Sequence, residues 1–140
     1  MKQFTSAILF ALLATITLPV SAQKIEGVTV TKIDASTSTV TGQPIVLPSQ
    51  NVQVITSTFD IAVGAKLPRH EHPFPRYAYV LQGELEVQYE GSGTKLYKTG
   101  ELIVEAINTW HQAENKGSVP VRLLVIDQVE AGKSNTILAK

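Results

Sequence analysis

Hydrophobic and polar residues alternate along much of the chain after residue 22, with the two-residue period of β-strands. In the clearest example, Leu85, Val87 and Tyr89 alternate with glutamate and glutamine residues. This alternation is typical of a strand with one face in the core and the other in water. The segment 51–61 alternates in the same way and is also predicted to be a strand.

The other predicted strands are short and separated by turn residues. They are expected at 27–31, 45–47, 77–81, 95–98, 102–104 and 119–126. Turns recur about every 8–12 residues, which predicts an all-β fold, an antiparallel sandwich or barrel. No segment after residue 22 keeps a helical period beyond about two turns, so a helical bundle is disfavoured. The tail from Ala131 is expected to be loose.

The first 22 residues have the three-part pattern of a secretory signal peptide. Lys2 gives a positive start, 7–20 is mostly apolar, and small residues at 20–22 form a cleavage site. A membrane anchor is the alternative, but the apolar run is shorter than the roughly 20 residues that a spanning helix needs. We therefore expect cleavage after Ala22, and a periplasmic or secreted chain over 23–140 with no stable membrane span.

Composition narrows the function classes. The 140-residue chain is 44% hydrophobic and 17% charged, and it has no cysteine. These values favour a folded domain, and they exclude disulfides, thiolate metal sites and a cysteine nucleophile. Lys plus Arg and Asp plus Glu both total 12, so the net charge is zero. We expect no nucleic-acid partner, because such proteins carry an excess of positive charge.

Three histidines carry most of the candidate chemistry: His70, His72 and His111. Residues two apart on a strand project to the same face, so the imidazoles of His70 and His72 can reach one point. Neutral imidazole is a common ligand of iron, zinc, copper and nickel. Two ligands make a weak site, and His111 is the one other histidine in the sequence. The alternative is three unrelated surface or hydrogen-bonding histidines.

The spacing around these histidines resembles that of the cupin superfamily. Its first motif is similar to Gly64, His70, His72 and Gly83, and its second to Gly100, His111 and Asn115. The segment 79–87 looks like the central hairpin of that family. The resemblance covers about 51–127. It implies a double-stranded β-helix, a jelly-roll barrel, as one domain over 23–140, with the three histidines around a metal.

The chain departs from the cupin pattern where the family normally places a glutamate ligand. After the second histidine stand Arg76 and Tyr77 instead. A guanidinium stays protonated and cannot ligate a cation, so Arg76 either points inward and repels a metal or swings out to hold an anionic substrate. Tyr77 is expected to ligate weakly, donate a hydrogen bond or move a proton. In the second motif, Ala106 and Asn108 replace the usual proline and glycine.

Glu105 is the candidate replacement for the missing acid. It lies in the otherwise apolar segment 102–107, where a carboxylate is costly unless it is exposed, paired or bound to a metal. We expect Glu105 to be a partner of a ligand histidine, an acid/base group or a fourth metal ligand. The alternative is a solvent-facing side chain outside the barrel. Phe74 and Trp110 are candidates for lining a substrate cavity, with core packing as their alternative.

The resemblance implies one divalent transition metal, with Fe(II) or Mn(II) favoured and zinc, nickel and copper as alternatives. Three functions stay open. The first is a metal-dependent enzyme, dioxygenase-like or an isomerase or lyase, acting on a small, anionic molecule, with Glu105 or Tyr77 moving a proton. The second is a non-catalytic periplasmic cupin that binds a small molecule or a metal, and the third is a scaffold protein with a degenerate site. A homodimer through strands 27–31 and 45–47 is also expected.

Overall fold

The computed structural model describes residues 26–140, and the predicted signal peptide lies outside the described residues. The chain divides into two units, one ending at Thr31 and one over Lys32–Lys140. In the first unit, residues 26–31 form a turn followed by an irregular segment. All the strands belong to the second unit. Within residues 26–140, no helix is long and apolar enough to cross a membrane.

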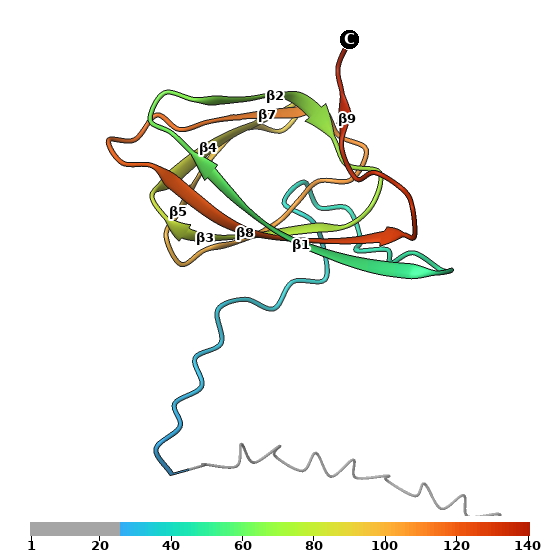
Figure 1. Ribbon diagram of the computed structural model, residues 1–140, viewed down its shortest axis with the longest axis horizontal. Coiled ribbons are helices and arrows are strands. Elements are labelled where there is room, and N and C mark those ends of the chain that lie inside the picture. Colours follow the sequence, from blue (N-terminus) through green and yellow to red (C-terminus); the bar gives the residue numbers. More distant parts are fainter. Residues whose placement is uncertain (1–25) are drawn as a thin grey trace, which may run out of the picture. The chain divides into compact units, whose positions relative to one another are not determined.

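In the described part of the chain, nine strands form two antiparallel sheets, whose strand orders are β1-β8-β3-β6 and β5-β4-β7-β2-β9. The strands are β1 (Val52–Ile61), β2 (Lys66–Glu71), β3 (Arg76–Gln82), β4 (Glu84–Tyr89), β5 (Gly93–Lys98), β6 (Leu102–Val104), β7 (His111–Glu114), β8 (Val121–Glu130) and β9 (Ile137–Leu138). The sheets face each other (Figure 1). The predicted all-β jelly-roll fold is confirmed.

The core lies between the sheets and consists of alternate, inward-facing residues. Strand β8 shows this best, because Val121, Leu123, Val125 and Val129 are buried and the residues between them are more exposed. It pairs with β1 on one side and β3 on the other, so its inward side chains sit at the centre of the first sheet. Strand β4 supplies Leu85, Val87 and Tyr89 from the facing sheet, as its alternation predicted.

Two predicted strands are wrong: the segments 27–31 and 45–47 are irregular. Alternation alone does not make a strand when no neighbouring edge pairs with it. Pro44 and Pro48 flank the second segment and lack the N–H that a ladder needs, and only an isolated bridge joins Ser38 to Pro44. The homodimer stays a prediction, without the two strands on which it was based.

The C-terminal segment is docked on the barrel, so the prediction of a loose tail from Ala131 is wrong. Strand β9 pairs antiparallel with β2, and Asn135 is 5% exposed. The N–H of Ala139 also donates to the carbonyl of Arg69 at 3.0 Å. A strand of two residues is too short to produce an alternating pattern, so strand β9 could not be predicted from periodicity.

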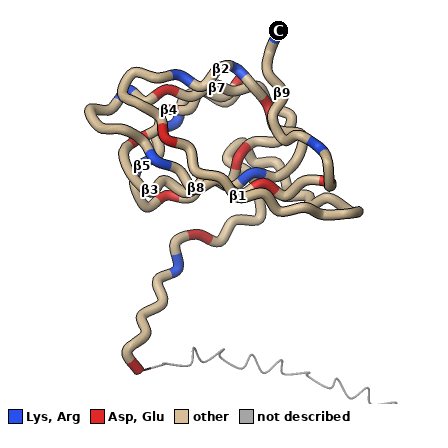
Figure 2. The backbone as a smooth tube through the Cα atoms, viewed as in Figure 1, with Lys and Arg blue, Asp and Glu red and all other residues tan. Residues whose placement is uncertain are grey.

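Charged residues of both signs are interspersed along the barrel strands (Figure 2). Some form exposed pairs, such as Arg122 with Asp60, whose Nε and Oδ1 lie 3.4 Å apart. Exposed pairs of this kind contribute little to stability. The ion pair between Arg76 and Asp127 is different because both side chains are buried. It belongs to the candidate site.

Gly83 should be the glycine least tolerant of substitution. It has φ +80°, and a Cβ added there would lie 2.8 Å from the carbonyl oxygen of Pro120. Gly91 is the control, because it has φ +74° and no atom within 4 Å of such a Cβ. Both alanine variants should lose about 1–2 kcal/mol from left-handed strain. Gly83→Ala should lose at least about 1 kcal/mol more through overpacking. Urea unfolding measures both, and equal losses would contradict the close approach.

Candidate metal centre

His70, His72 and His111 converge inside the barrel. His70 and His111 are direct cross-strand partners of β2 and β7, and His72 follows two residues after His70 on the same side. Their exposed fractions are 6%, 1% and 3%. One ring nitrogen from each lies within 4.8 Å of those of the other two. The structure therefore brings the three predicted ligands together.

Each ring is held by a hydrogen bond from Nδ1 to a backbone carbonyl. The carbonyls belong to Pro68 at 2.6 Å, Asn135 at 2.6 Å and Thr109 at 2.8 Å, for His70, His72 and His111 in turn. A carbonyl only accepts, so Nδ1 carries the proton in all three rings. The lone pair is then on Nε2, the nitrogen left to bind a metal.

Burial also keeps the three imidazoles neutral. Desolvation, helped by the positive charge of Arg76, lowers the pKa of His72 to about 2. Desolvation lowers the pKa of His111 to about 4, and it lowers the pKa of His70 as well. A metal competes with protons for these nitrogens, so neutral rings at neutral pH are ready to ligate.

Arg76 points into the barrel and is paired with Asp127. Its Nε lies 2.7 Å from Oδ1 and its Nη2 lies 3.0 Å from Oδ2, a bidentate ion pair between side chains that are 10% and 8% exposed. The two residues are direct cross-strand partners of β3 and β8. Arg76 therefore does not swing out, and Asp127 offsets part of its positive charge next to the histidines. The remaining nitrogen, Nη1, makes a long contact of 3.5 Å with His72 Nε2.

Glu105 also lies inside the barrel, so the solvent-facing alternative is wrong. Its Oε2 is 3.8 Å from Nε2 of His111. Among buried side-chain atoms of residues 26–140, this oxygen is the one without a hydrogen-bond partner. Desolvation raises the pKa of Glu105 to about 7, although Arg76 acts in the opposite direction. Its N–H donates to the carbonyl of Arg76 at 2.9 Å, so the acid lies on the segment next to Arg76.

The polar groups surround a small internal cavity of about 20 Å³. The three histidines, Arg76 and Glu105 line one part of it, and apolar residues such as Phe59 and Leu67 line the rest. A space of this size holds about one water-sized group. All three histidines are buried, and His111 also borders an open surface pocket beside Trp110.

The structure does not bring Tyr77 or Phe74 to the histidines. Successive residues of a strand face opposite sides, so Tyr77 points away when Arg76 points in. Its hydroxyl donates to Oε1 of Gln128 at 3.1 Å on the neighbouring strand. Phe74 lies in the turn after His72 and lines a separate surface pocket with residues that include Pro44.

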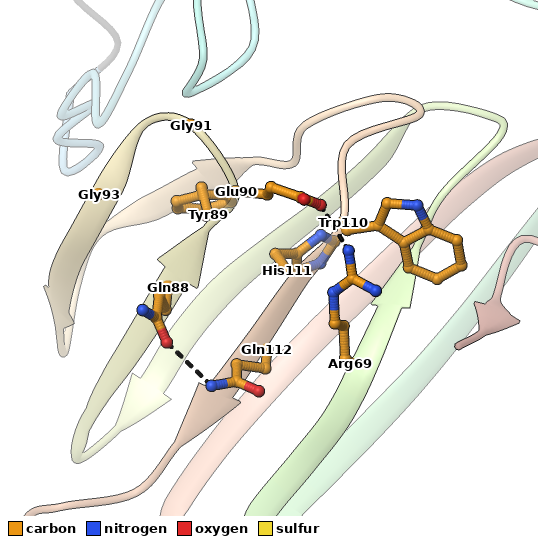
Figure 3. A pocket seen from close by; sticks show the side chains of 9 residues that line it. All are labelled: Arg69, Gln88, Tyr89, Glu90, Gly91, Gly93, Trp110, His111 and Gln112. Carbon is orange, nitrogen blue, oxygen red and sulfur yellow. Dashed lines mark hydrogen bonds and ion pairs between the residues drawn. The ribbon is translucent and has the colours of Figure 1, made fainter. Parts of the chain in front are cut away.

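Trp110 is also outside the cavity, although it precedes His111. It borders a surface pocket with Gln88 and Gln112, which face outward from β4 and β7 and are hydrogen-bonded to each other at 2.9 Å (Figure 3). The guanidinium of Arg69 lies 4.8 Å from the centre of the indole ring. Trp110 thus makes a cation–π contact with Arg69 and lines the same surface pocket as His111.

Sequence reasoning missed three residues of the polar cluster: Asp127, Asn135 and Thr136. Asp127 had a detectable signal, because it is on the same parity as the buried valines of β8. A charged residue at a core position needs a buried partner. Asn135 and Thr136 had no such signal, since they precede a two-residue strand and act through tertiary contacts.

A family model agrees with this geometry. The model described as "Cupin domain" matches residues 57–127, half of the chain, and this range holds all three histidines. The chain belongs to the cupin family. Asn108 shows how this cupin accommodates a missing motif glycine, because it takes φ 48° and its N–H donates to the carbonyl of His72 at 2.8 Å. Asparagine tolerates this left-handed conformation better than most residues.

Solved structures share the cupin fold at low identity. The DMSP lyase DddQ from Ruegeria pomeroyi has a TM-score of 0.54 and 21% identity, over 61% of this chain and 43% of the lyase. An oxalate decarboxylase from Lactobacillus farciminis has a TM-score of 0.53 and 22% identity, over 61% of this chain and 26% of the decarboxylase. The polyketide cyclase RemF from Streptomyces resistomycificus has a TM-score of 0.53 and 19% identity, over 62% of each chain. This cupin thus spans less than two thirds of each, and the likeness concerns the fold alone. No curated protein matches the chain.

The lowered histidine pKa values predict that the metal-free protein loses stability in mild acid. The unfolded histidines, with a pKa of 6.5, take up protons between pH 7 and pH 5 that the folded ones do not. Stability from these groups is present above pH 6.5 and is lost as the pH falls. Glu105 acts in the opposite sense, because its pKa is higher in the folded state, but three histidines outnumber it.

Urea unfolding in the presence of a chelator at pH 7, 6 and 5 should therefore show a falling free energy of unfolding. His72→Gln removes one group that binds a proton only in the unfolded state. The slope of the free energy of unfolding against pH should therefore fall by roughly 1.4 kcal/mol per pH unit at most. Stability that is constant or higher at pH 5 would show that the buried rings are not neutral.

Proposed function

We propose that this cupin binds one first-row divalent metal ion, Fe(II) or Mn(II) ahead of zinc, nickel or copper, through Nε2 of His70, His72 and His111. The observation that carries the proposal is the arrangement of the rings. Three buried, neutral imidazoles each use Nδ1 as a donor to the backbone, which leaves three converging Nε2 lone pairs.

The surrounding charges fit a cation. Asp127 holds the guanidinium of Arg76 in a bidentate pair and offsets part of its positive charge, although Nη1 still lies 3.5 Å from Nε2 of His72. The unpartnered Oε2 of Glu105 adds an oxygen donor close to His111. The enclosed cavity has room for an ion-sized group. Carboxylate and imidazole together suit first-row divalent metals.

We further propose that the bound metal serves a proton-transfer enzyme, an isomerase or lyase acting on a small anionic molecule outside the cytoplasm. When bound, a divalent ion polarises a substrate oxygen as a Lewis acid. Glu105 Oε2 would then take the proton made acidic by this polarisation. Burial raises the pKa of Glu105 to about 7 in the metal-free protein, and a bound cation would lower it, so the carboxylate would be in its basic form at neutral pH. The lyase and the decarboxylase of similar fold illustrate chemistry that the barrel can support, without indicating a substrate.

The cavity size does not separate proton transfer from a dioxygenase-like reaction. About 20 Å³ accommodates one water-sized group, so the substrate of either enzyme would have to approach the metal from outside this space. We prefer proton transfer because Glu105 places a carboxyl group beside His111. The small volume favours a second candidate function, a non-catalytic cupin that only binds a metal or a small ligand. The two candidates differ in whether Glu105 removes a proton.

Metal content tests the first part of the proposal. Protein purified without an affinity tag should contain about one equivalent of a first-row divalent metal after reconstitution, measured by elemental analysis. A His70→Ala, His72→Ala, His111→Ala triple variant should contain none, and the fold of both should be checked by circular dichroism. Wild-type protein that takes up no metal under any condition would overturn the metal site.

Deuterium exchange tests the second part. Metal-loaded protein is incubated in D₂O with a panel of small hydroxy- and keto-carboxylates, and mass spectrometry detects exchange of the hydrogen next to the carbonyl or hydroxyl carbon. Glu105→Gln should retain the metal, since the histidines hold it, and should slow exchange by about 100-fold or more. Carboxylate binding without exchange would establish the non-catalytic alternative.

A further inference from the structure

Asn135 is hydrogen-bonded both to His72 and to the ion pair of Arg76 and Asp127. It lies outside the residues that match the family model. Its backbone carbonyl accepts the Nδ1–H of His72 at 2.6 Å. Its side-chain Nδ2 donates to Oδ1 of Asp127, the partner of Arg76, also at 2.6 Å. The next residue, Thr136, accepts a hydrogen bond from Arg76 Nη2 at 3.3 Å. The C-terminal segment thus fixes a metal-ligand candidate and the adjacent ion pair together.

His72 differs from the other two histidines in where its partner comes from. The carbonyls that hold His70 and His111 belong to Pro68 and Thr109, each two residues earlier in the same stretch of chain. These local bonds form whenever the strand forms. The partner of His72 is 63 residues away in sequence. The tautomer and ring orientation of His72 therefore depend on the docking of a separate segment.

The side chain of Asn135 is the main attachment of that segment beside His72. Its Oδ1 accepts the N–H of Phe74 at 2.8 Å, and its Nδ2 also reaches the carbonyl of Pro75 at 3.4 Å. Strand β9 adds only two paired residues of its own. Without this side chain, the backbone carbonyl at position 135 would no longer be held beside His72. The hydrogen bond from Nδ1 of His72 would then be weakened.

We propose that Asn135 is a positioning residue that sets the metal affinity of this cupin by holding His72 with Nδ1 protonated and Nε2 directed inward. The inference rests on the proposed metal function. Partners that orient a ligand histidine typically change metal affinity by about 10–100-fold when they are removed.

Asn115 provides a matched control for a purely structural role. It is fully buried, at 0% exposed. Its side chain also makes three hydrogen bonds, to the carbonyls of Ile61 and Val119 and from the N–H of Gly117. None of these bonds involves a histidine of the site or the Arg76–Asp127 pair. A variant at this position loses comparable burial and hydrogen bonding without touching His72.

The experiment compares Asn135→Ala with Asn115→Ala in the full-length protein. Three quantities are measured: the midpoint of urea unfolding, the affinity for Co(II) in competition with a chelator, and the ¹⁵N chemical shifts of the histidine rings in metal-free protein. Both variants should lose stability. Only Asn135→Ala should weaken Co(II) binding, by about 10–100-fold, and move the His72 ring nitrogens towards a mixture of tautomers.

Asn135→Ala with wild-type Co(II) affinity and unchanged His72 shifts would overturn the inference. Equal losses of Co(II) affinity in the two variants would overturn it too, because they would follow from stability alone. If Asn135→Ala does not fold, Asn135→Ser keeps a smaller polar side chain and should show a smaller loss in the same direction. Failure of the proposed metal function is distinguishable, since the wild type would then bind no Co(II) while the ring shifts still report on Asn135.

Discussion

The buried ion pair between Arg76 and Asp127 is the interaction on which the polar half of this barrel depends. The apolar period of β8 turns Asp127 inward together with the core valines. The register of β3 and β8 then places Arg76 directly opposite. Neither charge is tolerable alone in this interior, because removing one partner of a buried pair typically costs about 3–5 kcal/mol. Strand register and charge pairing therefore enforce each other.

This pair also organises its neighbours. Asp127 accepts a hydrogen bond from the side-chain amide of Asn135. This bond helps to hold the C-terminal segment beside His72. The backbone carbonyl of Arg76 accepts a hydrogen bond from the N–H of Glu105, and this bond holds the acid beside the cavity. Asp127 is engaged by Arg76, so Glu105 is the acid next to the histidine cluster. An acid from the segment between β6 and β7 thus lies beside the three histidines.

Enclosure gives the site its chemical character. Burial keeps the imidazoles neutral and raises the pKa of Glu105, because a low-dielectric interior penalises the charged form of both groups. The same burial prepares the nitrogens for a cation and leaves the carboxyl group able to exchange a proton near neutral pH. One physical cause therefore produces both neutral imidazoles and a carboxyl group with a raised pKa within a small volume.

The sequence by itself determined the strand periodicity, the all-β class and the His-x-His face, because a two-residue period is a local property of the chain. The motif spacing extended this to the cupin fold and to the third histidine. Only the tertiary structure decided that Arg76 turns inward to Asp127, that Tyr77 turns away, that Glu105 is buried and that Asn135 holds His72. It also decided that 27–31 and 45–47 are not strands. These outcomes depend on which segments pair across more than fifty residues of sequence, as in Arg76 with Asp127, and local patterns carry no information about such partners.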